Sequence, residues 1–382
     1  DRVVLRGGYG IYYARTPGLL LSTAILNNGF ASAQYLITSN IPVYPNILKA
    51  PPGLGTPPDI YVTAPDFKTP RTQQFSLQTE IALGGSSSVT IGYLGVNGTH
   101  LTRTRDVNLF PSVATTGYIC PTSAACTAAQ GTPVTYYRHQ AFGSIRSNTA
   151  FGRISVFDSG GNSIYHGGFV QYQRRFAQNL QVQASYTLSK VIDTVPDATS
   201  VVPGNAGDDA KVAQDTLLPN LDRGPGNADI RHRLVLSGVW DINYAHAVAN
   251  PVLKGLLNYW QLGMLTQAQS GRAFNDITTG DPGNDSNTAN DRSPGVGRNT
   301  LRGPEFASVD VRLSKDIPLA GERVRLRLIG EAFNLTNRAN FNGIQTTRYT
   351  FSGGFFRPTT NFLATQTVYD PRIIQLAAKI IF

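Results

Sequence analysis

The chain has 382 residues, of which 15% are charged, and its formal net charge is +9. Glycine, tyrosine and phenylalanine are abundant, with 38, 17 and 18 residues, a composition that suits many strands joined by turns. No run of 18 apolar residues occurs, which argues against a transmembrane helix. Nucleic acid is not an expected partner, because no basic run, zinc-finger spacing or aromatic RNA-binding motif accompanies the positive charge.

Phosphates of lipid headgroups and of lipopolysaccharide, or an acidic partner domain, fit this charge instead. The chain begins at Asp1 and shows no secretory signal, so we expect a fragment or a mature piece of a longer protein. Its two cysteines, Cys120 and Cys126, flank a short run of small residues. We expect them to form a local disulfide in an oxidising compartment, and two free thiols in a loop are the alternative.

Alternation of apolar and polar residues predicts ten strands along the chain. The clearest case is residues 180–192, in which Leu180, Val182 and Ala184 alternate with glutamine and serine. In chain order the predicted strands are residues 2–15, 71–83, 88–101, 163–176, 180–192, 230–242, 256–269, 306–317, 322–334 and 371–382. Aromatic residues gather near the strand ends, as in the interfacial girdles of a membrane barrel or from strand propensity alone.

The connections between these strands alternate between long and short. Long connections follow the odd-numbered strands and occupy residues 16–70, 102–162, 193–229, 271–304 and 336–370. Short or medium ones follow the even-numbered strands, at residues 84–87, 177–179, 243–254 and 318–321. The first long connection is rich in proline, which predicts a loop, and the second is expected to contain a hairpin of residues 134–137 and 153–157. Outer-membrane barrels have long extracellular loops and short periplasmic turns, so the sequence predicts an all-β, antiparallel, up-and-down transmembrane barrel.

The last predicted strand has one apolar face, made by Ile374, Leu376, Ala378, Ile380 and Phe382. Its length matches the roughly 9–11 residues that a strand needs to cross a bilayer. An exposed edge strand would promote aggregation in a soluble sheet, whereas a closed barrel has no edge. We therefore expect this strand to run towards the periplasm and to face lipid with its apolar side.

Several motifs resemble barrel strands of TonB-dependent outer-membrane receptors, in particular the subgroup that carries a carboxypeptidase-regulatory-like domain. The motifs are residues 4–13, 93–101, 162–166, 173–176, 184–190, 229–238 and 331–338. The resemblance implies active uptake of a large or scarce nutrient across the bacterial outer membrane, driven by an inner-membrane energy-transducing complex. A siderophore, an oligosaccharide and a peptide all remain possible ligands.

Members of that family have a regulatory-like domain, a TonB box and a plug before the barrel, and this chain has none of these. Ten strands are also fewer than the roughly 22 of such transporters. We therefore expect residues 1–382 to be the carboxyl-terminal portion of one barrel. The expected partners are the plug domain and the TonB complex, reached through the missing front of the protein, and the barrel-assembly machinery, which would recognise the final strand ending at Phe382.

Basic side chains share the polar face that would line the lumen: Arg6, Arg174, Arg231, Arg233, Arg312, Arg325, Arg327 and Lys379. Arg231 and Arg233 are two residues apart and point the same way. Such a pair can hold an acidic plug or guide an anionic substrate. The alternative, which we favour, is that the arginines pair with acidic residues on neighbouring strands, namely Asp241, Asp310 and Glu331.

One loop gathers oxygen ligands, with Asp281, Asp285 and Asp291 among several asparagines. Calcium prefers such ligands, although the spacing is not that of an EF-hand and a solvated turn is the alternative. The histidines are scattered and no acidic pair or Ser/His set stands out, so no enzyme and no other cofactor is expected. A passive porin-like channel and a surface adhesin or structural barrel are the alternatives to a transporter.

Overall fold

The computed structural model describes residues 2–16, 18–29, 57–195, 211–245, 247–320 and 324–382, together with residues 43, 45 and 209. Parts of four predicted connections therefore lie outside the described residues. These are residues 17, 30–42, 44 and 46–56 of the first long loop, residues 196–208 and 210 of the third, residue 246 of the connection at 243–254, and the end of the predicted turn at 318–321. Residues 322 and 323, predicted as the start of a strand, lie outside them as well.

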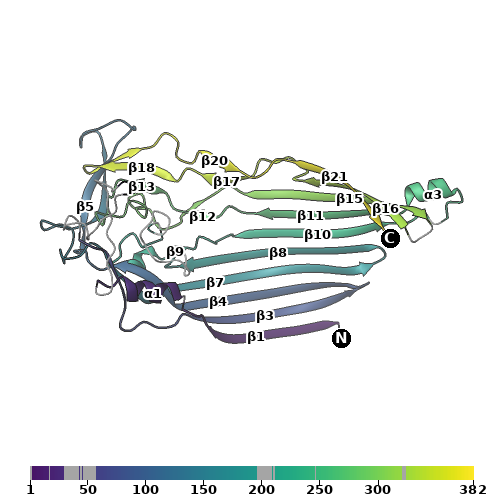
Figure 1. Ribbon diagram of the computed structural model, residues 1–382, viewed down its shortest axis with the longest axis horizontal. Helices are drawn as coiled ribbons and strands as arrows, with labels where there is room; N and C mark the ends of the chain where they lie inside the picture. The colour runs from purple at the N-terminus through teal and green to yellow at the C-terminus, as the bar shows by residue number, and fades with distance from the viewer. Residues whose placement is uncertain are drawn as a thin grey trace.

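Each of the ten predicted strands corresponds to one long strand, and together these form a single antiparallel sheet (Figure 1). The order across the sheet is the order along the chain. The strands are β1 (Val3–Tyr13), β3 (Arg71–Gly84), β4 (Ser87–Asp106), β7 (Ile154–Ala177), β8 (Leu180–Asp193), β10 (His232–Ile242), β11 (Trp260–Gln269), β15 (Phe306–Ala320), β16 (Val324–Phe333) and β21 (Ile373–Ile381).

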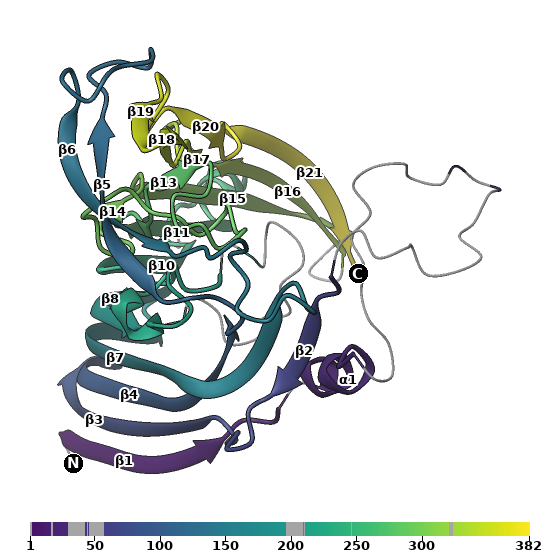
Figure 2. The same cartoon turned by 90° about the vertical axis from the view of Figure 1, so that its left-hand side faces the viewer.

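The sheet is strongly curved, so that it forms an open trough with β1 at one edge and β21 at the other (Figure 2). Continuous neighbour-to-neighbour pairing fixes which residues share a face. Leu77 pairs with Tyr93, for example, and Leu236 pairs with Ala184. The apolar members of the alternating pattern therefore gather on one face of the sheet and the polar members on the other.

Large hydrophobic side chains on the apolar face remain exposed along the whole sheet. Leu5 is 67% exposed in the first strand, Ile91 is 52% exposed in β4, and Leu376 is 84% exposed in the last strand. A water-soluble sheet would bury such a face against a second layer. The register of β21 is the predicted one, because Ile374 and Leu376 lie on this apolar face, while Phe382 follows the strand and is 97% exposed.

The two ends of the trough differ, and we call them the turn end and the loop end. At the turn end, tight turns join β3 to β4 and β7 to β8, and helix α3 (Pro251–Leu257) lies between β10 and β11 (Figure 1). The prediction that a strand begins at residue 256 is wrong. Asn250 caps the helix by accepting hydrogen bonds from two backbone N–H groups, and Pro251 fits the first helical turn, so the chain turns helical there before β11 begins.

At the loop end the long connections fold into structure of their own. The first contains α1 (Gly18–Leu26) and β2 (Ile60–Thr63), which sequence periodicity did not predict. Leu20 of α1 packs with Tyr61 and Phe157 in a small buried core, and β2 runs parallel to the start of β7. The other short elements are β9 (Gly224–Pro225), η1 (Pro219–Asp222), β12 (Ala273–Phe274), β14 (Leu301–Arg302), β17 (Phe341–Ile344) and β20 (Thr365–Val368).

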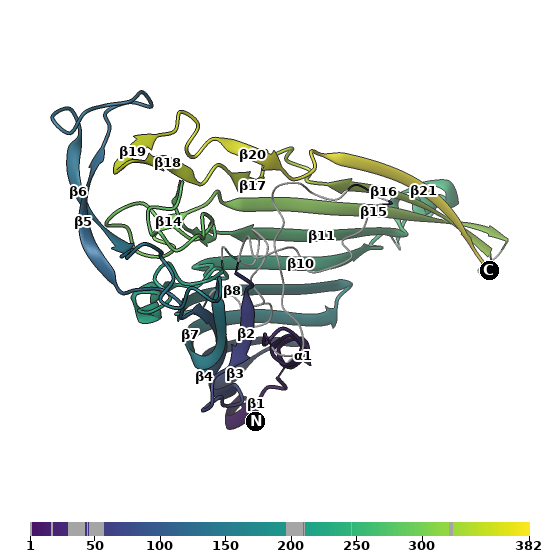
Figure 3. The same ribbon diagram turned by 60° about the vertical axis from the view of Figure 1, so that its left-hand side comes forward.

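A second sheet of five strands covers the loop end, and we call it the loop layer (Figure 3). Its strands come from three different long connections: β5 (Ser112–Ile119) and β6 (Thr132–His139), β13 (Ile277–Thr279), and β18 (Thr347–Ser352) with β19 (Phe355–Pro358). The predicted hairpin of residues 134–137 and 153–157 is wrong. β6 pairs with β5, and residues 154–157 extend β7, because the longer partner strands offer more backbone hydrogen bonds.

The loop layer has its own aromatic core of Tyr136, Tyr349, Phe351 and Phe356. Phe356 is fully buried and touches the other three rings at centroid distances of 4.8 to 6.2 Å. Cys120 directly follows β5 and is bonded to Cys126, which fastens the start of the connection between β5 and β6. The described parts of the second, fourth and fifth long connections are therefore packed into one folded unit.

Candidate functional site

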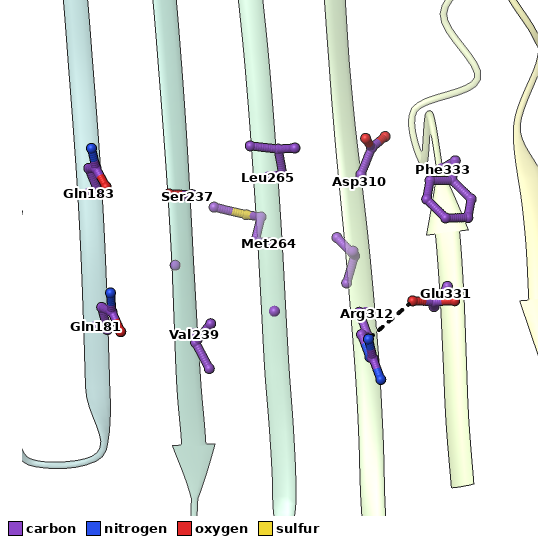
Figure 4. Close-up of a pocket in the computed structure, with 13 residues that line it drawn as sticks. Gln181, Gln183, Ser237, Val239, Met264, Leu265, Asp310, Arg312, Glu331 and Phe333 are labelled. Atoms are coloured by element: carbon purple, nitrogen blue, oxygen red, sulfur yellow. Dashed lines mark ion pairs between the residues drawn. The ribbon is translucent and has the colours of Figure 1, made fainter. Parts of the chain in front are cut away.

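The polar face of the trough contains a hollow of about 340 Å³ that spans strands β8, β10, β11, β15 and β16 (Figure 4). Gln181, Gln183 and Ser237 line one side of it. Asp310, Arg312 and Glu331 line the other, where Arg312 and Glu331 form an ion pair of 3.6 Å. We call this polar face, on which the hollow lies, the inner face of the trough.

Most of the predicted arginines lie on this inner face, and several pair with acids other than the expected ones. The prediction for Arg174 is wrong, because Arg174 stands opposite Val182 and so lies on the apolar face. Arg327 forms a bidentate ion pair with Asp316, at 2.6 and 2.8 Å, and Arg325 approaches the same carboxylate at 3.7 Å. Arg231 pairs with Asp229, and Arg233 is exposed.

Of the three predicted acidic partners, only Glu331 bonds an arginine in the described part of the chain. Asp241 accepts a hydrogen bond from Gln261, and Asp310 accepts hydrogen bonds from Ser308 and from the backbone N–H of Asn334. Partner choice depends on which strands are neighbours and in which register, and alternation alone does not give either.

A second cavity, of about 410 Å³, lies at the loop end, and we call it the loop cavity. Three segments far apart in sequence enclose it together with Phe356: the β5–β6 hairpin, residues 214–222 and residues 282–297. Tyr136 and Phe356 provide a buried aromatic wall, while Tyr137 and Leu221 are about 60% exposed. Such a size and such an apolar lining with a few polar groups are typical of small-molecule sites.

The charged groups of the loop cavity are paired within its wall. Arg292 donates a hydrogen bond of 2.6 Å to Asp222, and both side chains are buried. Asp215 accepts a hydrogen bond of 2.5 Å from Ser112, and its other oxygen lies 3.8 Å from Nε2 of His139. Arg292 and Asp222 therefore neutralise each other, whereas the carboxylate of Asp215 has no cationic partner in the wall when His139 is neutral.

Three buried polar atoms on residues that line this cavity have no hydrogen-bond partner: Nε2 of His139, Nε of Arg292 and Oγ of Ser293. The residues are 2%, 7% and 3% exposed. Nδ1 of His139 lies 2.7 Å from the carbonyl oxygen of Phe110, so in the neutral ring Nδ1 donates and Nε2 accepts. Buried polar groups without partners are costly, and a ligand that offers both a donor and an acceptor satisfies them.

The loop with Asp281, Asp285 and Asp291 borders the loop cavity, and its carboxylates accept hydrogen bonds from the loop's own backbone. Asp281 accepts from the N–H groups of residues 285 and 286, Asp285 from that of residue 287, and Asp291 from that of residue 283. Burial, reinforced by the charges of Asp285 and Asp281, raises the pKa of Asp291 to about 8. Burial likewise raises the pKa of Asp285 to about 6.

No group of three or more histidine, cysteine, aspartate or glutamate side chains is arranged to hold a metal ion within the described ranges. Calcium binding by this loop therefore stays a prediction. The structure describes a turn whose carboxylates bond to backbone N–H groups, and because Asp285 and Asp291 are buried it is not the solvated turn expected as the alternative.

A family model for an outer membrane beta barrel domain matches residues 1–295 and 294–375 of this sequence. The chain belongs to this outer-membrane barrel family. Among solved structures, it is similar to the outer membrane transporter YddB from Escherichia coli, with 11% identity and a TM-score of 0.51. That alignment covers 99% of this chain and 38% of YddB, so the chain spans well under half the length of this relative.

The FrpB iron transporter from Neisseria meningitidis is a more distant match, with 12% identity, a TM-score of 0.40 and coverage of 85% of this chain and 33% of that one. No curated protein sequence matches. At such identities the likeness shows the fold alone. Within the described ranges there is also no helix long and apolar enough to cross a membrane.

Membership of this family shows which face of the sheet meets lipid and which meets the lumen, and which end of the trough is extracellular and which is periplasmic. The exposed apolar face is the lipid-facing surface of an outer-membrane barrel, and the polar concave face is its lumen side. Long loops of such barrels are extracellular and short turns are periplasmic, so the loop layer and the loop cavity lie outside the cell. His139, Arg292 and Ser293 were not singled out by sequence reasoning. They come together only through contacts between distant loops, and no local pattern marks them.

Proposed function

We propose that residues 1–382 are the carboxyl-terminal part of the barrel of a TonB-dependent transporter, and that the loop cavity first binds the transported ligand. The loop cavity is the main support for this proposal, because it combines an aromatic wall with buried polar atoms that lack hydrogen-bond partners and lies at the loop end of a polar trough. The transported compound would be a large or scarce nutrient, namely a siderophore, an oligosaccharide or a peptide. Because three buried polar atoms of the lining residues lack partners, the ligand group that enters the cavity would carry hydrogen-bond donors as well as acceptors.

The edges of the sheet support the placement of this chain within a larger barrel. β1 and β21 end the strand order, and each leaves one side for pairing with further strands. In the whole protein, β21 would close the barrel against a strand that precedes residue 1, and the barrel-assembly machinery would recognise this strand through Phe382. The plug, the TonB box and the carboxypeptidase-regulatory-like domain of the resembling subgroup would also belong to that preceding part.

The experiment compares three bacterial strains: wild type, a deletion of this gene, and a deletion of the gene for TonB. Each is grown on a panel of single nutrients that includes ferric siderophores, oligosaccharides and peptides. Active transport predicts that one nutrient fails to support growth in both deletion strains. If that nutrient depends on this gene but not on TonB, the protein is a passive channel. If no nutrient depends on this gene, the adhesin or structural barrel is the better hypothesis.

A matched pair of substitutions tests the role of the loop cavity in the same assay. Leu221 lines the cavity and is 63% exposed, whereas Leu218 is three residues away, 52% exposed, and does not line it. Leu221→Trp fills the cavity from its rim and should reduce uptake of the nutrient, and Leu218→Trp should leave uptake unchanged. Equal uptake by both variants would show that the ligand does not pass through this cavity.

A further inference from the structure

Helix α3 lies in an unusually long connection at the turn end of the sheet. The two fully described connections there are two-residue turns, at residues 85–86 and 178–179. Helix α3 lies in a connection of 17 residues between β10 and β11, of which residue 246 is outside the described part of the chain. None of the seven residues of the helix is fully buried, although four of them are large and apolar. These four are exposed by 79%, 46%, 61% and 47%: Val252, Leu253, Leu256 and Leu257.

The four apolar side chains form one continuous stripe. Their spacing of one, three and one residues places them on the same side of a helix with 3.6 residues per turn. Lys254 and Gly255 take the other side and are half-buried. The helix therefore turns its polar side towards the protein and its apolar side away from it, the reverse of a helix on a water-exposed surface.

Two side chains fix the carboxyl end of α3 on the lipid-facing side of the barrel wall. Lys315 and Trp260 are direct partners in the β11–β15 pairing, and both lie on the face that carries Leu313. Nζ of Lys315 donates hydrogen bonds to the carbonyl oxygens of residues 255, 256 and 258, and Nε1 of Trp260 donates one of 2.8 Å to the carbonyl of Leu256. Because both residues point towards lipid, the end of the helix that they hold lies on that side.

The surroundings of α3 continue the lipid-facing surface of the barrel. Trp240 and Tyr259 are exposed beside it, and Nε1 of Trp240 donates to the hydroxyl of Tyr244. Lys315 lies 5.0 Å from the centre of the Trp260 ring. Aromatic rings and lysines of this kind gather where a membrane meets water, since each has an apolar body and a polar tip.

We propose that α3 is an interfacial helix that inserts its apolar stripe into the periplasmic leaflet of the outer membrane, with phospholipid as its partner. The stripe is continuous with the lipid-facing surface of the barrel, as in helices that lie in a membrane interface. The helix thereby fixes how deep the β10–β11 part of the barrel sits in the membrane. This inference does not depend on which compound, if any, the barrel transports.

The test uses the full-length protein in vesicles of phosphatidylethanolamine and phosphatidylglycerol. A single fluorophore is attached to Leu256→Cys in the stripe or, as the matched control, to Ser86→Cys in the tight turn at the same end of the barrel. Both cysteines of the chain are already bonded to each other, so they do not compete for the label. Quenching is measured with iodide in the water and with brominated acyl chains in the lipid.

We expect the label at Leu256→Cys to be quenched several-fold less by iodide and several-fold more by brominated lipid than the label at Ser86→Cys. Equal iodide quenching at the two positions would overturn the proposal, because the stripe would then be in water. Protection from iodide that disappears as the protein is diluted into excess lipid would overturn it as well, because a second copy of the protein would then cover the stripe. A quadruple substitution of the stripe by serine should leave the β-sheet circular dichroism unchanged, and Trp260 should become more accessible to iodide.

Discussion

Replacement of Phe356 by alanine removes the centre of the loop-layer core. The side chain is fully buried and packs against Phe351, Tyr136 and Tyr349. Loss of a buried phenylalanine costs about 3–5 kcal/mol, since the apolar transfer energy is lost and a cavity remains. The site has little freedom to collapse, because three rings surround it and β19 is held between β18 and β5. We therefore expect about 4 kcal/mol, which is about a thousandfold increase in local opening.

Native-state hydrogen exchange of the full-length protein measures this opening strand by strand. Backbone amides of β5, β6 and β19 should exchange about a thousandfold faster, while those of β10 and β11 should keep their protection. Val113→Ala is the control, because Val113 lies on β5 with 40% of its surface exposed and should change exchange little. Equal acceleration in loop layer and barrel would refute the reasoning, since the loop layer would not be a separate cooperative unit. Unchanged exchange everywhere would refute the packing of Phe356.

Three further predictions concern the loop end. The raised pKa of Asp291 means that folding favours its protonated form, so its contribution to loop stability is present below about pH 4 and is lost as the pH rises to about 8. Asp291→Asn should flatten the decline in thermal stability between about pH 4 and 8, and an unchanged decline would contradict the assignment. Gly117→Val should make the loop layer sensitive to protease, because a Cβ there would lie 2.8 Å from the ring of Phe356; a protease-resistant variant would show that the ring is placed differently. Replacement of Cys120 and Cys126 by serine should lower the stability of the loop layer by about 2 kcal/mol, because the entropy of closing so short a loop is then no longer saved. Backbone hydrogen exchange should become faster in β5 and β6 only, and a general loss of protection would contradict a local role of the disulfide.

Strand periodicity predicted the barrel sheet well, for a physical reason. Each barrel strand has one side in lipid and the other in a water-filled lumen. Apolar and polar side chains therefore alternate along a strand, as from Leu180 to Leu188. The alternation of long and short connections then gave the direction of every strand. Errors occurred where this constraint stops, at residues 18–26 and 251–257, where helices form beyond the membrane-spanning part of the sheet.

The candidate site was predictable only in part. The disulfide partners are close in sequence, so proximity alone suggested their pairing. Pairs such as Arg292 with Asp222, 70 residues apart, depend on how separate loops pack on one another. The loop cavity has the same origin, since His139, Leu221 and Ser293 come from three different connections and share no spacing. Alternation grouped most of the basic residues on one face of the sheet but misplaced Arg174, and the partners of these residues followed from strand register, as for Arg327 and Asp316.

The orientation of the barrel in the outer membrane is the claim on which the rest depends, and cysteine labelling in intact cells tests it most directly. Thr149→Cys lies at an exposed position of the loop end, and Ser86→Cys lies in a tight turn at the opposite end. With a membrane-impermeant maleimide, Thr149→Cys should react in intact cells, and Ser86→Cys should react only after the outer membrane is permeabilised. Labelling of Ser86→Cys in intact cells, with Thr149→Cys protected, would contradict the orientation and with it the extracellular loop cavity and the periplasmic helix.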